Sequence, residues 1–447
     1  MASPTSCTRV SGGLARGRSG LTRAQRARGP PPTPVISPQR ETAAETIEAS
    51  DKYIVGTYVR PEIVFTHGEG SLLFDSEGKE YLDFTAGIAV NALGHSDASW
   101  VAAVQEQAAK LTHVSNLFHT EPGPALAKRL CESAPFADRV FFCNSGAEAN
   151  EAAFKFARKR AAMLAADDGT GGAHATGAVA FSNAFHGRTM GALALTWKEG
   201  YRKPFEPLPT GVEFAEYGNL ESAAEHIRRG ETAAVFVEPV QGEGGIYPAN
   251  IEFLQGLRKL CDDAGAALIF DEVQCGLGRT GALWAHLPAD VKPDMMTVAK
   301  PLAGGLPIGA CLVTEEVNSA LAPGDHGSTF AGGPLVCHAA LAVMDRVEGD
   351  GFLDHVSEMG ERLRAGLRAA VGDSAHVREV RGAGLLVGVQ LDCAAGPLVV
   401  ACREAGLLVI TAGAGDVLRL VPPLTVSAQE VDRAVDLIAK CFPALDQ

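Results

Sequence analysis

The feature that most constrains this chain is a repeated alternation of short apolar segments with helical segments between residues 139 and 314. Each apolar segment has the length of a buried strand, and several of the intervening segments carry helical periodicity. Such alternation predicts an α/β fold with a mainly parallel sheet covered by helices on both faces. The candidate strands are RVFFCN, GAVAFSN, AAVFVEPV, AALIFDEV, DMMTVAK and GACLVT, and the candidate helices between them are 147–165, 220–229 and 251–264.

The pattern changes after about residue 350. Three helical segments (352–371, 396–405 and 428–440) are interspersed with the strand-like segments VREVRGAGLLVGVQL, GLLVITAG and VLRLVPPL, which is an α+β pattern. We therefore expect a large domain over residues 96–345 and a smaller C-terminal domain over 346–447. Residues 43–95, which include a hairpin-like segment turning at Ser76–Gly78, are expected to contribute to the small domain.

The first 42 residues differ from the rest in composition. Residues 1–40 contain seven Arg and no Asp or Glu, and they are rich in Ser, Gly, Pro and Thr. An Arg-rich, Ser-rich and acid-free leader without an apolar core is typical of an organelle transit peptide, whereas a disordered tail is the plainer alternative. The Ser/Pro-rich opening favours the chloroplast stroma over the mitochondrial matrix. We exclude residues 1–42 from the fold.

Composition argues against several classes of protein. The net charge is −14, so the chain lacks the basic balance of a nucleic-acid binder. It contains no apolar run long enough to cross a membrane. The ten cysteines are scattered, and several lie in apolar runs, so we expect reduced thiols in the core. The sequence has no metal-binding motif, and no metal is expected.

Two consecutive candidate strands end in residues whose side chains could bind the same cofactor. Asp271 ends one candidate strand, and Lys300 follows the next strand along the chain. A lysine that is desolvated has a lowered pKa and becomes a nucleophile. Pyridoxal phosphate needs this pair, because its aldehyde condenses with a lysine while a carboxylate keeps its ring nitrogen protonated. A lysine at a strand end that reaches solvent and an acid that caps a helix are the structural alternatives.

Other residues at the same sheet edge suit the remainder of such a cofactor. Ser145 and Glu148 form a capping box after a strand, so the first-turn amides of Gly146 and Ala147 can bind a phosphate. Phe185 can cover a face of a flat ring. Arg188 offers a planar guanidinium group that can bind a carboxylate. The structural alternatives, Phe185 as a core residue and Arg188 as a surface residue, are about as common for each residue considered alone.

A dinucleotide site is the competing interpretation of this region. Gly276, Gly278 and Gly281 match G-x-G-x-x-G, the fingerprint of an NAD-dependent oxidoreductase. The fingerprint requires a helix that opens within the glycines and an acid at the end of the next strand. Here the glycines are followed by a loop, and the next strand leads to Lys300. We therefore treat the match as accidental.

Six motifs in order complete a resemblance to a known family. They are NSGAEANEAAFKFAR, FHGRTMGAL, EPVQGEGG, LIFDEVQCGLGRTG, AKPLAGGLPIGA and GSTFAGGP. Over nearly all of residues 45–444 the chain resembles the class III aminotransferases of pyridoxal-phosphate fold type I. This resemblance implies a mainly parallel seven-stranded sheet flanked by helices and a homodimer with a shared active site. The segments FTAGIAVNALGH and THVSNLFHTEPGPALAKRL are similar to the branch that acts on acetylornithine in arginine biosynthesis.

The resemblance also implies a role for each matching residue. Lys300 would bind the cofactor covalently, and Asp271 would bind its ring nitrogen. The other expected cofactor-binding residues are Ser145, Gly146, Ala147, Phe185, Val273, Gln274 and, from the partner subunit, Thr329. The expected substrate-binding residues are Tyr58, Arg188, Glu243, Ser328 and Arg419.

The expected reaction transfers the terminal amine of acetylornithine to 2-oxoglutarate. Arg188 would bind the distal carboxylate of each substrate, and Arg419 the second carboxylate of glutamate. Glu243 would pair with Arg419 when that carboxylate is missing. Ornithine and 4-aminobutyrate aminotransferases are the nearest alternatives, although ornithine enzymes tend to carry a Tyr where this chain has Ile88. A catalytically inactive binding protein on the same fold is a further alternative.

Overall fold

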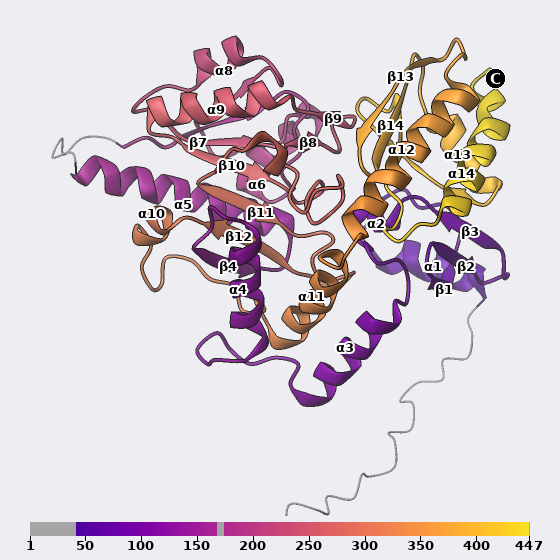
Figure 1. Cartoon of the computed structure of the whole chain (residues 1–447), viewed down its shortest axis with the longest axis horizontal. Helices are drawn as coiled ribbons and strands as arrows, with labels where there is room; N and C mark the ends of the chain where they lie inside the picture. The colour runs from indigo at the N-terminus through magenta and orange to yellow at the C-terminus, as the bar shows by residue number, and fades with distance from the viewer. Residues whose placement is uncertain (1–41, 168–173, 447) are drawn as a thin grey trace, which may run out of the picture. The chain divides into compact units, whose positions relative to one another are not determined.

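The computed structural model describes residues 42–167 and 174–446, so the expected transit peptide (1–42), apart from its last residue, falls outside the described residues. The chain divides into two compact units, Met1–Val64 and Phe65–Gln447. In the first unit, helix α1 (Ala43–Tyr53) begins with a capping box in which Thr42 and Glu45 satisfy each other's backbone amides. The second unit contains every other helix and strand of the described residues (Figure 1).

A seven-stranded sheet forms the centre of the second unit. Its strand order is β4-β12-β11-β10-β7-β5-β6. All pairings are parallel except those of β12, which runs antiparallel to both of its neighbours. The expected mainly parallel seven-stranded sheet is therefore confirmed. The strands are β4 (Arg139–Cys143), β5 (Gly177–Phe181), β6 (Val212–Ala215), β7 (Thr232–Val237), β10 (Ala267–Asp271), β11 (Met295–Val298) and β12 (Gly309–Val313).

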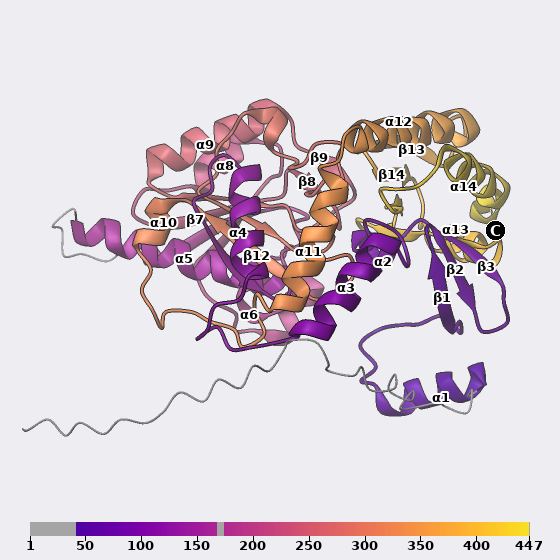
Figure 2. The same cartoon turned by 60° about the horizontal axis from the view of Figure 1, so that its bottom comes forward.

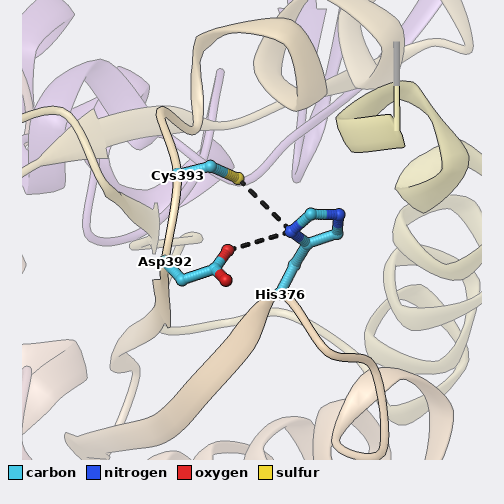
Figure 3. A group of neighbouring side chains, drawn as sticks. All are labelled: His376, Asp392 and Cys393. Carbon is cyan, nitrogen blue, oxygen red and sulfur yellow. Dashed lines mark hydrogen bonds and ion pairs between the residues drawn. The ribbon is translucent and has the colours of Figure 1, made fainter.

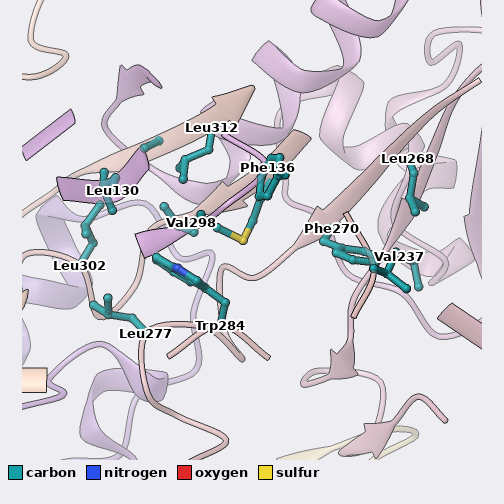
Figure 4. Close-up of a cluster of buried hydrophobic side chains, with 14 of the residues drawn as sticks. Leu130, Phe136, Val237, Leu268, Phe270, Leu277, Trp284, Val298, Leu302 and Leu312 are labelled. Atoms are coloured by element: carbon teal, nitrogen blue, oxygen red, sulfur yellow. The ribbon is translucent and has the colours of Figure 1, made fainter. Parts of the chain in front are cut away.

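Helices cover both faces of this sheet. Successive strand residues point to opposite faces, and apolar residues on both faces must be buried. Leu268 and Phe270 pack into the cluster that includes residues of α4, α9 and α11, with the fully buried Trp284 (Figure 4). Ala267 and Ile269 pack into a second cluster, on the side of α5. The helices of this part are α3 (Ala98–Lys110), α4 (Pro122–Ser133), α5 (Gly146–Asp167), α6 (Met190–Ala194), α7 (Glu199–Arg202), α8 (Leu220–His226), α9 (Ile251–Ala264), α10 (Glu315–Ser319) and α11 (Pro334–Val347).

Strand β6 and helix α11 are among the elements of this part that were not expected from the sequence. Strand β6 has only four residues and is interrupted by Glu213, so it forms no continuous apolar run. Helix α11 is largely apolar, and seven of its fourteen residues are buried, which removes the polar face that marks an amphipathic helix.

Two smaller sheets involve the C-terminal part of the chain. One has the order β13-β14-β17-β16, and the other has the order β1-β2-β3-β15. The expected hairpin turn at Ser76–Gly78 joins β2 to β3, and β3 pairs in parallel with β15 from the C-terminal region. The strands are β1 (Phe65–Glu69), β2 (Leu72–Asp75), β3 (Glu80–Asp83), β13 (Val377–Ala383), β14 (Leu386–Leu391), β15 (Leu407–Leu408), β16 (Ile410–Ala412) and β17 (Val417–Leu420), and β8 (Val240–Gln241) pairs with β9 (Tyr247–Pro248).

Three helices cover the C-terminal strands. They are α12 (Phe352–Val371), α13 (Gly396–Glu404) and α14 (Ala428–Cys441), and the first and last lie side by side (Figure 2). Their buried residues share a hydrophobic cluster with β14 and β17. Among the described residues, no helix has the length and apolar character needed to cross a bilayer.

The short turn α2 (Ala86–Ala89) has an unusual backbone. Its four residues all have positive φ values, and that of Ile88 is 63°. A β-branched residue in this region is strained, and such strain tends to occur where function requires a particular geometry.

Candidate functional site

The carboxyl ends of five strands meet at one edge of the large sheet. Strands β4, β5, β7, β10 and β11 run in the same direction, since only β12 is reversed. The chain segments that leave these ends carry Asn144, Asn183, Glu238, Asp271 and Lys300. In an open parallel sheet this edge is where ligands bind, so the fold gathers the predicted polar residues at the expected place.

Asp271 is held by a network of buried hydrogen bonds. It is 3% exposed, and its Oδ2 accepts hydrogen bonds from Asn150 Nδ2 at 2.8 Å and His186 Nδ1 at 2.7 Å. Its Oδ1 accepts from the backbone amide of Val273 at 3.0 Å. Asn150 in turn accepts from Thr297 Oγ1 at 2.8 Å. These contacts fix the position of the carboxylate.

The sequence analysis missed Asn150 and His186. Asn150 lies one helical turn beyond Gly146 in α5, and His186 lies between Phe185 and Arg188 in a motif that was recognised for its other residues. The only sequence feature that could have indicated these two residues was their position beside predicted site residues. Neither side chain could be assigned to Asp271 without knowing how α5 and the segment after β5 pack on the sheet.

Two further ionisable groups adjoin Asp271. Burial acts to lower the pKa of His186, but its hydrogen bond to Asp271 and the nearby carboxylates raise that pKa overall. Burial raises the pKa of Glu238 to about 7, with His186 opposing and Asp271 adding to the shift. Glu238 accepts hydrogen bonds from the amides of Phe185 at 3.2 Å and Gly242 at 3.3 Å. The charges of His186 and Glu238 at this edge therefore depend on each other and on the neighbouring Asp271.

Lys300 lies in this electrostatic environment without a direct partner. Within residues 42–167 and 174–446, no hydrogen bond or ion pair engages its amine. Burial lowers the pKa of Lys300, and the charge of Arg419 lowers it further, while Asp271, Glu243 and Glu238 act in the opposite direction. A buried amine with a lowered pKa is suited to nucleophilic attack and proton transfer.

The start of α5 is close to the Asp271 loop. A side chain on Gly146 would come within 2.6 Å of Val273 Cγ1, so only glycine allows this approach. Ser145 Oγ accepts from the Glu148 amide at 3.2 Å, and Glu148 reaches back to the Asn144 amide at 2.6 Å. In the described part of the chain, the amides of Gly146 and Ala147 have no hydrogen-bond acceptor, which suits an anion.

A pocket of about 250 Å³ opens beside Phe185 and Glu243. Tyr201 also lines it, and the Arg188 guanidinium lies 3.4 Å from the centre of the Tyr201 ring and 5.6 Å from that of Phe185. Arg188 is exposed and forms no ion pair with a carboxylate of the described residues. Tyr201 was not predicted, because an aromatic residue thirteen positions from Arg188 carries no sequence signal of contact.

Arg419 and Glu243 form an ion pair with an Nη2–Oε2 distance of 2.9 Å. The Arg419 side chain is 3% exposed, whereas that of Glu243 is 39% exposed. Arg419 Nη1 also donates to Gln274 Oε1 at 3.3 Å, and its buried Nε has no acceptor in the described residues. Gln274 packs tightly against Gly242, where a Cβ would come within 2.4 Å of its amide carbon. A buried cation, a partly exposed acid and an amide thus converge.

The remaining predicted residues lie in three different settings. Ser328 Oγ accepts from Asn144 Nδ2 at 2.8 Å, which connects it to the start of α5. Thr329 is exposed and forms no side-chain hydrogen bond within the described residues. Tyr58 belongs to the first unit and is 74% exposed. The structure therefore connects Ser328 to the site, whereas the Thr329 side chain has no hydrogen-bond partner among the described residues.

These residues fit a planar, phosphorylated aldehyde. Lys300 provides a partnerless amine, Asp271 a fixed carboxylate, and Gly146 and Ala147 two free amides at a helix N-terminus. The G-x-G-x-x-G segment is a loop, with no helix within its glycines. The segment therefore lacks the helix that a dinucleotide fingerprint requires, which does not favour the dinucleotide interpretation.

Comparison with known proteins agrees with this geometry. The family model of class-III aminotransferases matches residues 55–442. A mitochondrial acetylornithine aminotransferase of Alnus glutinosa is 60% identical over 403 residues, which cover 90% of this chain and 88% of the relative. An N-acetylornithine aminotransferase from Stenotrophomonas maltophilia superposes with a TM-score of 0.75 at 35% identity, covering 90% of this chain and 99% of the other.

An ornithine aminotransferase from Toxoplasma gondii superposes with a TM-score of 0.84 at 31% identity, covering 91% of this chain and 96% of the other. That structure was described with partial occupancy of pyridoxal phosphate at its active site. Matches of this extent establish the relationship for residues 55–442, which are most of the chain. The chain belongs to the class-III aminotransferases, a family that depends on pyridoxal phosphate.

Proposed function

We propose that this enzyme transfers the terminal amine of N2-acetyl-L-ornithine to 2-oxoglutarate, as a step of arginine biosynthesis. The observation that carries this proposal is the ion pair between Arg419 and Glu243. Glutamate has a carboxylate beside its reacting carbon, whereas acetylornithine has none there. A site for both substrates therefore needs a cation that binds this carboxylate of glutamate. The protein must neutralise the same cation when acetylornithine is bound.

The two side chains differ in the way that such a site requires. Arg419 is buried and held by Gln274 and by the carbonyl oxygen of Thr411, so it stays in place. Glu243 is 39% exposed at the edge of the pocket, so it can move into solvent. We propose that Glu243 neutralises Arg419 when acetylornithine is bound and withdraws for glutamate. Without Glu243, acetylornithine would leave a buried charge unpaired.

We assign the chemical step to Lys300 and its surroundings. When bound, pyridoxal phosphate supplies an electron sink for the carbon that loses its proton. Lys300 removes the proton from the substrate carbon and returns one in the reverse half of the reaction, and its lowered pKa suits both roles. Asp271, fixed by His186 and Asn150, would keep the ring nitrogen of the cofactor protonated.

Cofactor binding is assigned to the surrounding residues. We propose that the amides of Gly146 and Ala147, with Ser145 nearby, bind the phosphate, that Phe185 and Val273 contact the ring, and that Gln274 donates to its hydroxyl group. We also propose a homodimer in which Thr329 of the partner subunit reaches the phosphate. The exposure of Thr329 in the single chain supports this assignment.

Substrate binding is assigned to the pocket beside Phe185. We propose that Arg188, which has no carboxylate partner and is stacked on Tyr201, binds the carboxylate distant from the reacting carbon. Ser328 lies near the substrate in this assignment, and Tyr58 approaches it on assembly of the enzyme.

Ornithine is the second candidate substrate, because the Toxoplasma neighbour is an ornithine aminotransferase. We favour the acetylated substrate, since Ile88 is an apolar residue in a segment where ornithine enzymes tend to carry a Tyr. An apolar wall suits an acetamide better than an unpaired ammonium group.

Steady-state assays on the leaderless protein test the proposal. We expect kcat/KM for acetylornithine to exceed that for ornithine and for 4-aminobutyrate by at least tenfold. Lys300→Ala should abolish turnover and the visible absorbance of the bound cofactor. A preference for ornithine would transfer the assignment to the second candidate, and no transamination of any of the three would refute both.

We further propose the organisation and location of the chain. Residues 96–345 would form the large cofactor-binding domain, and 346–447 with 43–95 the small one, which the pairing of β3 with β15 supports. Residues 1–42 would direct the chain to an organelle. The Alnus relative is named mitochondrial, whereas the Ser/Pro-rich leader favours the chloroplast stroma. A fusion of residues 1–42 to a fluorescent protein distinguishes the two compartments.

A further inference from the structure

Three side chains with metal-ligating atoms meet at the open end of the β13–β14 hairpin (Figure 3). They are His376, Asp392 and Cys393, and one ligand atom from each lies within 4.8 Å of the others. The backbone fixes the arrangement, because the amide of Asp392 donates to the carbonyl oxygen of His376 at 3.0 Å. The next pair of residues, Val377 and Leu391, is in register in the sheet. The cluster is therefore built on paired strands.

The distances among the three ligand atoms suit a small divalent ion. His376 Nδ1 lies 2.9 Å from Asp392 Oδ1 and 3.8 Å from Cys393 Sγ. Cys393 Sγ and the Asp392 ligand oxygen lie within 4.8 Å of each other, which completes the triangle. In a tetrahedral zinc site, the usual bond lengths place a nitrogen and a sulfur ligand roughly 3.5 Å apart, and a nitrogen and an oxygen ligand slightly closer. The two distances from His376 Nδ1 therefore differ by about half an ångström or less from those of a zinc site.

Residues around the cluster hold its ligands in the orientation that a metal needs. His376 Nε2 lies 3.1 Å from Asp446 Oδ1, so the carboxylate can accept the Nε2 proton and leave Nδ1 free as a ligand. Metal-bound histidines usually have such a carboxylate partner. Arg378 Nη2 lies 3.4 Å from Asp392 Oδ2, on the oxygen that does not face His376. The oxygen that faces His376 remains available.

We propose that His376, Asp392 and Cys393 bind one zinc ion, with Asp446 orienting the histidine. A set of one thiolate, one imidazole and one carboxylate favours zinc over magnesium or calcium, which prefer oxygen ligands. Three protein ligands leave a position for water. Asp446 lies in the last short helix (Phe442–Asp446), so the ion would hold the C-terminal end of the chain to the hairpin. The proposal is independent of the proposed transamination.

No sequence motif indicates this site, because His376 is sixteen residues from Asp392 and no zinc spacing is present. In the metal-free protein, hydrogen bonds to Asp392 and Asp446 raise the pKa of His376. A proton is therefore the competitor of the ion, and measurements are best made at a mildly alkaline pH.

Equilibrium dialysis of the full chain against Zn²⁺, with bound metal measured by mass spectrometry, tests the proposal. We expect one equivalent in the wild type that is absent at the same free zinc concentration in His376→Gln and Cys393→Ser, with affinity lowered at least tenfold. Asp446→Asn should weaken binding about tenfold or more. Cys131→Ser is the matched control, because Cys131 is also a partly buried free thiol, and it should bind zinc as the wild type does.

Thermal unfolding gives a second readout, since an ion that binds only the folded protein raises its melting temperature. Zinc should raise the Tm of the wild type and of Cys131→Ser by a few degrees and leave that of Cys393→Ser unchanged. If His376→Gln does not fold, the comparison of Cys393→Ser with Cys131→Ser still tests the proposal. Equal zinc binding in the wild type and Cys393→Ser, or no bound zinc in the wild type, would overturn the proposal.

Discussion

Replacing Glu243 by glutamine should change the balance between the two substrates of this enzyme. The substitution keeps the shape of the side chain but removes the charge that lies 2.9 Å from Arg419. Bound glutamate or 2-oxoglutarate supplies its own carboxylate to Arg419, whereas acetylornithine supplies none. We therefore expect a loss of activity with acetylornithine and little loss, or a gain, with glutamate.

The size of the effect follows from the geometry of the pair. Two unit charges about 4 Å apart interact by about 4 kcal/mol at the effective dielectric constant near a protein surface. The Glu243 side chain is 39% exposed, so solvent screens much of this energy. A remaining difference of about 1–2 kcal/mol corresponds to a roughly 5- to 30-fold lower kcat/KM for acetylornithine.

The assay measures kcat/KM for each half-reaction in the wild type and in Glu243→Gln. Glu199→Gln is the matched control, since Glu199 lines the same pocket and is also exposed, but within the described residues its ion pair is with Lys203 and not with Arg419. The control should leave the ratio of the two kcat/KM values unchanged. An equal loss for both substrates in Glu243→Gln, or no loss with acetylornithine, would refute the role assigned to the pair.

Three other predictions concern the surroundings of the site. Asn150→Ala removes a donor to Asp271 and leaves buried polar groups unpaired, so the free energy of unfolding should fall by about 2–4 kcal/mol in chemical denaturation. Tyr201→Leu removes the ring stacked on Arg188 and should raise KM for both substrates several-fold with cofactor absorbance unchanged, whereas Tyr201→Phe should restore KM. Burial raises the pKa of Glu238 from 4.5 to about 7, so the folded state retains a proton that the unfolded chain releases, and stability falls as pH rises through this range. In Glu238→Gln this contribution should disappear from the pH dependence of unfolding, and an unchanged profile would contradict it.

Several features of this protein could be determined from its sequence. Short apolar runs alternating with helices are sufficient to predict a parallel sheet, because only buried strands combine that length with that composition. The same reasoning placed Asp271 and Lys300 at one edge, since parallel strands all end on the same side. The apolar pattern did not predict strand β6, which has too few apolar residues. It also did not predict helix α11, which has so many that no polar face remains.

The tertiary structure alone decided which side chains touch. The hydrogen bonds of Asn150 and His186 to Asp271 join residues 121 and 85 positions apart, and the stacking of Tyr201 on Arg188 depends on the path of the intervening loop. The cluster of His376 with Asp392 exists only because two strands pair in one register. Periodicity reports which face of an element is buried, but contacts between elements depend on packing at a scale of a few ångströms, which no local pattern encodes.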